Sequence, residues 1–243
     1  MLGGRTSQGK SAFALQIAWD LAEQGFRTWY VSLEMTADGL FERLFCNVMK
    51  INNRALLEGL GKSYVKEMDD FLKNRCKVKF ILTDNMGKTF REISDVVLMA
   101  ANKPQVIIID YIQATKAEKV EEERRAMNEY LMQFRNTCLK DGIVGIAVSQ
   151  INRKAETTRH NKPSMSQLKG TGVLEEHADT VLLLHWDWHY THNNDKFNEY
   201  DVIIAKQRNG VTGEHKLTFH PQYYRFEEFV ELPKGFNYGV YRK

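Results

Sequence analysis

The chain has 243 residues, 43% hydrophobic and 27% charged, a composition typical of a globular protein and not of a disordered or fibrous one. Its 34 basic residues are nearly balanced by 31 acidic ones, and the resulting net charge of +3 excludes a uniformly basic protein, so any polyanion site must be local. Cys46, Cys76 and Cys138 form no C-x-x-C pair, and no apolar run approaches the roughly 20 residues that cross a bilayer, so we expect a cytoplasmic protein with no membrane partner.

The first motif along the chain is a phosphate-binding loop. Residues 4–11 read Gly-Arg-Thr-Ser-Gln-Gly-Lys-Ser, a complete G-x-x-x-x-G-K-S pattern, and a helical stretch over Ala12–Gln24 is expected to follow it. Glycines let backbone N–H groups approach a phosphate, and a helix N-terminus adds partial positive charge. A glycine-rich turn that merely opens a helix is the alternative. The residues predicted to bind ATP are Gly4, Arg5, Thr6, Ser7, Gln8, Gly9, Lys10, Ser11 and Ala12.

Two of these residues have side chains with specific expected tasks. Lys10 would bring a mobile ammonium to the β- and γ-phosphates of the nucleotide, and Ser11 would ligate Mg²⁺. The pattern therefore predicts both ATP and Mg²⁺ as ligands.

Short β-rich runs alternate with helical stretches along the rest of the chain, which predicts an α/β fold: a mostly parallel twisted sheet with helices on both faces. Glu123–Lys140 is expected to be a helix, because apolar side chains share one face and Gly142 follows as a stop. The expected strands are Phe26–Leu33, Lys77–Leu82, Gln105–Asp110, Ile143–Ser149, Asp179–Trp186 and Tyr200–Lys206.

Three of the predicted strands end in polar side chains that suit a nucleotide site. Asp110 ends an apolar strand and is a candidate Mg²⁺ ligand, because P-loop enzymes hold the metal with an aspartate at such a position. Glu34 could orient the water that attacks the γ-phosphate, although a glutamate that caps the following helix explains it equally well. Gln150 could sense the γ-phosphate or be an ordinary strand end.

Three further segments lack a regular pattern. Ile151–Gly170 contains five basic residues and one acidic residue without apolar periodicity, which indicates a loop. The histidine-rich run 185–192 is interpreted as a surface loop and not as a metal site. After Glu231 the chain is expected to form an extended tail, so we predict one domain over residues 1–230 and a tail over 231–243.

The motifs, taken in order, resemble those of the motor domain of hexameric replicative DNA helicases of the DnaB type, including their phage relatives. Besides the phosphate loop, the resemblance is carried by residues 32–35 (Ser-Leu-Glu-Met), 109–113 (Ile-Asp-Tyr-Ile-Gln), 149–153 (Ser-Gln-Ile-Asn-Arg), 206–210 (Lys-Gln-Arg-Asn-Gly) and 217–219 (Leu-Thr-Phe). It implies a RecA-like core in a homo-hexameric ring that hydrolyses ATP, moves 5′ to 3′ on single-stranded DNA and unwinds duplex. Primase or a helicase loader would be further partners, in a bacterial cell or a phage-infected host.

The resemblance also assigns roles to single residues. It implies that Glu34 activates the attacking water, that Asp110 holds Mg²⁺ and that Gln150 couples the nucleotide state to DNA. It further implies that Lys206 and Arg208 reach the γ-phosphate bound by a neighbouring subunit, with Arg208 as an arginine finger. Without the resemblance, these two residues would be interpreted as exposed charges beside a turn.

A DNA-binding loop is likewise implied by the resemblance alone. Residues 168–172 read Leu-Lys-Gly-Thr-Gly and match the loop that in this family contacts the single-strand backbone, which assigns DNA binding to Lys169, Gly170, Thr171 and Gly172. The family often has an arginine and a glutamate where this chain has Lys169 and Gly170, although some phage members carry the glycine. A loop that binds phosphate through its backbone is compatible with both patterns.

The N-terminal segment departs from the family pattern, because only Met1–Gly3 precede the loop where relatives have a strand. We therefore expect that first strand to be missing. Two other functions remain open: a RecA-type recombinase that forms filaments, and a nucleotide-dependent regulator or loader that does not unwind DNA. Residues 206–208 and 168–172 favour the helicase.

Overall fold

The computed structural model describes residues 1–58, 64–75, 78–84, 92–93, 102–110, 120–151, 162–168 and 177–230. The strands found there are β1 (Leu2–Gly4), β2 (Thr28–Ser32), β3 (Phe80–Asp84), β4 (Val106–Asp110), β5 (Val144–Gln150), β6 (Thr180–His185), β7 (Glu199–Gln207), β8 (Gly213–His220) and β9 (Arg225–Glu228). They form one sheet in the order β3-β2-β4-β5-β1-β6-β7-β8-β9. Strands β1 to β6 are mutually parallel, whereas β7, β8 and β9 each run antiparallel to the preceding strand. The expected mostly parallel α/β sheet is confirmed.

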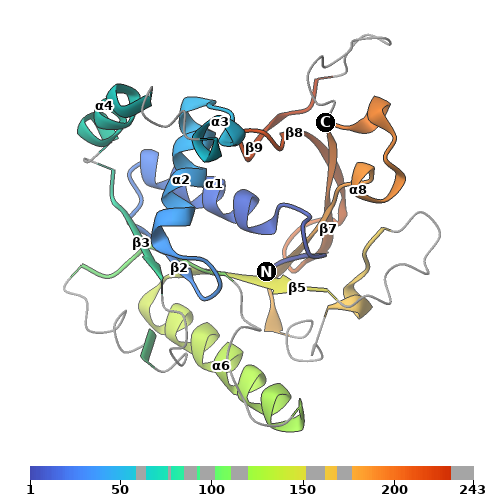
Figure 1. Cartoon of the computed structure of the whole chain (residues 1–243). Helices are drawn as coiled ribbons and strands as arrows, with labels where there is room; N and C mark the ends of the chain where they lie inside the picture. The colour runs from blue at the N-terminus through green and yellow to red at the C-terminus, as the bar shows by residue number, and fades with distance from the viewer. Residues whose placement is uncertain are drawn as a thin grey trace.

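Helices lie on both faces of the sheet (Figure 1). They are α1 (Lys10–Glu23), α2 (Ala37–Met49), α3 (Asn53–Leu57), α4 (Val65–Arg75), α6 (Val120–Asp141) and α8 (Trp188–Thr191). Helices α1 and α2 cover one face, and α6 covers the other. The predicted helix Glu123–Lys140 corresponds to α6, and the stretch after the phosphate loop corresponds to α1.

The central strand β4 explains why its sequence is a continuous apolar run. Successive side chains of a strand point to opposite faces, and here both faces are covered. Ile107 and Ile109 pack with α6 residues, whereas Val106 and Ile108 belong to the core beneath α1. By the same alternation, Asp110 points to the face that carries α1.

The segment before the phosphate loop differs from the expectation of a missing strand. Leu2–Gly4 form β1, which pairs with β5 on one side and β6 on the other and so occupies the middle of the sheet. A Cβ atom on Gly3 would lie 2.7 Å from the Leu168 side chain, so the strand lies very close to its neighbours. Three residues suffice because ladder hydrogen bonds on both sides hold them in place.

Two further segments differ from the sequence-based prediction. The antiparallel strands β8 and β9 were not predicted, because residues Gly213–Lys216 are exposed and polar and carry no apolar alternation. The histidine-rich run is not simply a surface loop, since His185 ends β6 and is 2% exposed, and Trp186 is also buried. Residues 152–161 and the predicted tail 231–243 lie outside the described residues.

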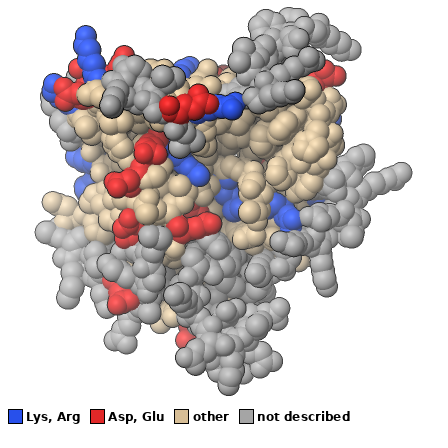
Figure 2. Space-filling view, viewed as in Figure 1, with Lys and Arg blue, Asp and Glu red and all other residues tan. Residues whose placement is uncertain are grey.

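Charges on the described surface are mixed. On the face shown in Figure 2, acidic and basic side chains are interspersed, which agrees with the near balance of the two kinds in the sequence. Within the described ranges, no helix is both long enough and apolar enough to span a membrane.

The sheet edge formed by β9 is tied to α2 by a polar network. The carboxylate of Glu227 lies 2.8 Å from Nζ of Lys50 and 3.0 Å from Nε of Arg225. Arg225 also donates a hydrogen bond to the Asn47 side chain. Hydrogen bonding by Lys50, with a smaller contribution from Arg225, lowers the pKa of Glu227 from 4.5 to about 2. A carboxyl group whose pKa is lower in the folded than in the unfolded state stabilises the fold at pH values above its unfolded-state pKa.

We predict that Glu227→Gln lowers the free energy of unfolding at pH 7 by about 1 kcal/mol, a value discounted for the solvent exposure of the pair. That loss corresponds to a fall of about 2–4 °C in Tm. The difference from wild type should shrink as the pH falls from about 4.5 towards 2, because wild-type Glu227 is then protonated as well. Thermal unfolding over this pH range measures the effect. Glu228→Gln is the control, and an equal loss in both variants would contradict the role of the network.

Candidate functional site

The predicted phosphate loop connects β1 to α1 and has a backbone conformation that few residues adopt. Ser7 and Gly9 have positive φ angles of 61° and 76°. At Gly9 a Cβ atom would also come within 3.3 Å of the Phe226 ring. Glycine is therefore required at Gly9 both by backbone angle and by close packing. The loop ends where α1 begins, so the free N–H groups of the first helical turn face the site.

Lys10 lies between the loop and the carboxylates. Its Nζ donates a 2.7 Å hydrogen bond to the carbonyl oxygen of Arg5, which holds the side chain over the loop. Burial lowers the pKa of Lys10, while the negative charges of Asp110 and Glu34 oppose that shift. The ammonium group is thus within electrostatic reach of the predicted Mg²⁺ ligand Asp110 and of the predicted catalytic residue Glu34.

Asp110 is a buried carboxylate with one unpaired oxygen. The residue is 3% exposed, and Oδ2 accepts a 2.6 Å hydrogen bond from the hydroxyl group of Tyr30. Oδ1 is buried and has no hydrogen-bond partner among the described residues. An unpaired buried carboxylate oxygen is costly unless a cation or donor meets it. The same Tyr30 hydroxyl lies 3.5 Å from the carbonyl oxygen of Ser11, so Asp110 lies near the start of α1, which fits the predicted pair of Mg²⁺ ligands, Ser11 and Asp110.

Glu34 follows the last residue of β2 by two positions and is exposed to solvent. The backbone N–H of Leu33 donates to the carbonyl oxygen of Asp110 at 2.7 Å, which keeps the two strand ends side by side. The alternative explanation, a helix cap, does not hold. Helix α2 is capped by Thr36, whose hydroxyl accepts from Gly39, so Glu34 has no such task.

Gln150 ends β5 beside the phosphate loop. Its Nε2 donates a 2.6 Å hydrogen bond to the hydroxyl oxygen of Thr6, and in the parallel pairing of β1 and β5 it is opposite Gly4. The structure therefore brings Gln150 to the loop, as the sequence predicted. Its amide is in contact with the part of the loop that surrounds the phosphates in P-loop proteins.

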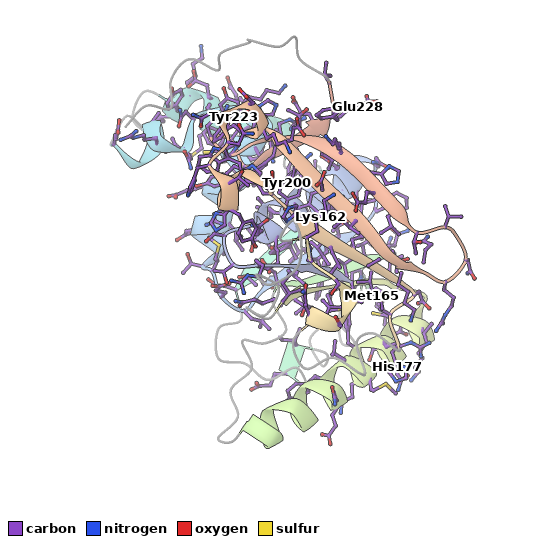
Figure 3. All side chains as sticks on the ribbon, turned by 90° about the vertical axis from the view of Figure 1, so that its right-hand side faces the viewer. Lys162, Met165, His177, Tyr200, Tyr223 and Glu228 are labelled. Atoms are coloured by element: carbon purple, nitrogen blue, oxygen red, sulfur yellow. The ribbon has the colours of Figure 1, made fainter. Side chains whose placement is uncertain are left out.

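Gln8 was predicted to bind nucleotide, but its side chain points into the protein. It is 1% exposed, and its Oε1 accepts a 2.6 Å hydrogen bond from the backbone N–H of Trp186. Its carbonyl oxygen accepts from the hydroxyl of Tyr200, a β7 residue labelled in Figure 3. Any contact of Gln8 with a phosphate would therefore involve its backbone, and the side chain anchors the loop to β6.

Lys206 and Arg208 lie at the opposite ends of the strands from the phosphate loop. Gly4 pairs with Leu184, which pairs with Val202, and Arg208 follows Val202 by six residues. With a rise of about 3.3 Å per residue, Arg208 is about 20 Å from its own phosphate loop. Its guanidinium contacts Asp179 at 2.6 Å, and both side chains are about half exposed.

The loop predicted to bind DNA is only partly described, because Lys169, Gly170, Thr171 and Gly172 lie outside the described residues. The residue before them is firmly placed: Leu168 is 1% exposed and forms a β-bridge with Ile151. The preceding segment is attached to β7 and β8, since Lys162, which is labelled in Figure 3, contacts Asp201 at 3.2 Å and Glu214 at 2.5 Å.

Sequence comparison identifies relatives of the whole chain. The family model described as DnaB-like helicase C terminal domain matches residues 1–228. A probable replicative DNA helicase of Trieres chinensis is 29% identical over 95% of this chain and 53% of its own length. The replicative DNA helicase DnaC of Bacillus subtilis is 29% identical over 98% of this chain and 53% of its own length. The chain thus spans about half the length of these relatives.

Solved structures show the same fold. One of them, an ATPase domain, superimposes with a TM-score of 0.84 at 24% identity, covering 94% of this chain and 84% of that one. A DnaB-like replicative helicase, described with its interactions with primase, gives a TM-score of 0.85 at 24% identity, with coverages of 94% and 58%. The expected RecA-like α/β fold is confirmed.

Replacement of Lys10 by Ala should lower the affinity for ATP by about 10- to 150-fold, because a charge-assisted contact to phosphate contributes roughly 1.5–3 kcal/mol. Equilibrium titration with a fluorescent, non-hydrolysable ATP analogue measures the loss. Lys73→Ala removes an exposed lysine of α4 and should leave binding unchanged. Undiminished binding by Lys10→Ala would refute the nucleotide site at this loop.

Proposed function

The chain belongs to the family of DnaB-like helicase C-terminal domains, and on this basis we propose that it is the ATP-driven motor of a replicative DNA helicase. It hydrolyses ATP with Mg²⁺ at the interfaces of a homo-hexameric ring, moves 5′ to 3′ on single-stranded DNA and unwinds duplex in the cytoplasm. A primase or a helicase loader would be its partner, in keeping with the primase interactions described for one structural neighbour. Family membership favours this function over a recombinase or a non-unwinding regulator.

Nucleotide binding follows from the groups gathered at the loop. Backbone N–H groups of the loop and of the first turn of α1 would cradle the phosphates, and Lys10 would exchange its bond to the Arg5 carbonyl for the β- and γ-phosphates. Ser11 and Asp110 would hold Mg²⁺, which neutralises phosphate charge when bound. Glu34 would accept a proton from the attacking water, because it is exposed, close to Lys10 and not engaged as a cap.

A short path of hydrogen bonds and adjacent residues joins the nucleotide site to the proposed DNA loop. Gln150 contacts Thr6 of the phosphate loop, and the next residue, Ile151, forms the β-bridge with Leu168. Lys169, the first proposed DNA contact, follows Leu168 directly. A γ-phosphate that drew the Gln150 amide away from Thr6 would therefore act on a strand end attached to the DNA loop.

The position of Arg208 is the observation that supports assembly into a ring. It lies about 20 Å from its own phosphate loop, measured along β7, and so cannot reach the γ-phosphate that this loop binds. A second copy could place the strand ends that carry its phosphate loop against the β7–β8 turn of the first copy. Arg208 of the first copy would then reach the γ-phosphate bound by the second. Sites at such interfaces explain why hydrolysis would depend on assembly.

Glu34→Gln should leave ATP bound but slow its hydrolysis by about 100-fold or more, since the shape is kept and the proton acceptor is lost. Nucleotide affinity and steady-state ATP turnover, measured on the same preparation, separate the two effects. Glu42→Gln, an exposed position on α2, is the matched control. Turnover within a few-fold of wild type would remove Glu34 from the proposed chemistry.

Arg208→Ala should bind ATP almost normally yet lose on the order of 10³ in turnover, the scale of an arginine finger. The complementation test mixes Arg208→Ala subunits, whose Lys10 site is intact, with Lys10→Ala subunits, which keep Arg208. Neither variant alone should hydrolyse ATP appreciably. The mixture should regain hydrolysis at mixed interfaces, and the recovery should increase with protein concentration.

Arg54→Ala serves as the control, because Arg54 is also an exposed arginine paired with a carboxylate, Glu58 at 2.9 Å. It should retain full turnover. Equal turnover by dilute and concentrated wild-type protein, with no recovery on mixing, would refute the ring mechanism even if the nucleotide site were real.

A further inference from the structure

We propose that Tyr30 is a positioning residue for the metal site: its buried hydroxyl fixes one oxygen of Asp110 and so presents the other oxygen to Mg²⁺. This inference rests on the proposed function, because it requires that Asp110 meets a metal–nucleotide complex. Tyr30 was not singled out by its sequence context, since an aromatic residue inside a strand is an ordinary core residue.

The sheet register brings Tyr30 to Asp110. Strands β2 and β4 are neighbours, with Ser32 opposite Asp110 and Tyr30 opposite Ile108. Tyr30 and Asp110 therefore point to the same face, the one covered by α1. The Tyr30 hydroxyl is 2.6 Å from Oδ2 of Asp110 and 3.5 Å from the carbonyl oxygen of Ser11. It thus lies between the two residues proposed to ligate the metal.

The chemistry of the two groups fixes the direction of this hydrogen bond. The Tyr30 hydroxyl donates, and the carboxylate oxygen Oδ2 of Asp110 accepts. Because Oδ1 is buried without a partner among the described residues, the carboxylate has one satisfied oxygen and one available oxygen.

A comparison within the same core shows that a buried tyrosine does not need a carboxylate. Tyr200 is also 0% exposed, and its hydroxyl donates to a backbone carbonyl, that of Gln8. Tyr30 has a backbone carbonyl nearby at Ser11, yet its short hydrogen bond goes to Asp110. The contact orients a group that would otherwise rotate, and residues that orient metal ligands typically change metal affinity by about 10–100-fold.

The test compares Tyr30→Phe with wild type in three measurements. The first is the Mg²⁺ concentration at which half of the Mg²⁺-dependent gain in affinity for a fluorescent, non-hydrolysable ATP analogue is reached. The second is the affinity for the same analogue in EDTA, and the third is the electron paramagnetic resonance spectrum of Mn²⁺ bound with the nucleotide. Phenylalanine keeps the buried ring, and thermal unfolding establishes that the variant is folded at the assay temperature.

Tyr224→Phe is the matched control, because it removes a hydroxyl that contacts Asn53 at 2.6 Å, beside α2 and α3. It should match wild type in all three measurements. Tyr30→Phe should raise the half-saturating Mg²⁺ concentration by about 10-fold, alter the Mn²⁺ spectrum and leave the affinity in EDTA unchanged.

A double variant tests the route of the effect. If Tyr30 acts through Asp110, adding Tyr30→Phe to Asp110→Asn should change the half-saturating Mg²⁺ concentration by less than about two-fold.

Two results would overturn the positioning role: an unchanged Mg²⁺ dependence in Tyr30→Phe, or an equal loss of affinity with and without Mg²⁺, which indicates a structural role only. Wild-type protein that bound the analogue with no Mg²⁺ dependence, or failed to bind it, would instead overturn the proposed metal–nucleotide site itself.

Discussion

Strand direction is the constraint on which the chemistry of this domain depends. The parallel strands β2, β4, β5 and β1 all end at one edge, so Asp110, Gln150 and the phosphate loop meet there although they are far apart in sequence. The antiparallel strand β7 ends on the opposite side, and Arg208 directly follows that end. One reversal of direction thus separates Arg208 from the phosphate loop of its own chain, and in the proposed ring a neighbouring copy would bring the two together.

The phosphate loop is supported by contacts with core residues that have no proposed role in the chemistry. The Gln8 side chain is bonded to the backbone of Trp186, its carbonyl is bonded to Tyr200, and Phe226 packs against Gly9. Phe219 and Phe226 stack with a centroid distance of 4.3 Å and join this support to β8 and β9. A loop with two positive φ angles needs such support, because its conformation is sparsely populated in an unconstrained chain. The strands that complete the sheet therefore also keep the loop ready for phosphate.

The sequence was sufficient to pick out the residues proposed to act at strand ends and insufficient for the residues that support them. Asp110 and Gln150 were predictable because a polar residue that ends an apolar run stands out. Tyr30 and Tyr200 were not, since their hydroxyl partners, a carboxylate and a carbonyl distant in sequence, become visible only in the folded register. Strand β1 escaped prediction because three residues carry no periodicity, and its existence depends on strands that follow it by more than a hundred residues.

In the proposed ring Arg208 would have to leave Asp179 for a neighbouring copy, and its contact with Asp179 is weak enough for that exchange. Both side chains are about half exposed, and an exposed ion pair contributes only about 0–1 kcal/mol to stability. A buried pair would cost several kcal/mol to separate and would hold the guanidinium within its own subunit. The exposed pair, just after β7, would instead release Arg208 at little cost. A γ-phosphate on a neighbouring copy carries more negative charge than one carboxylate, so the exchange of partners would be favourable when ATP is bound and would reverse when the γ-phosphate leaves.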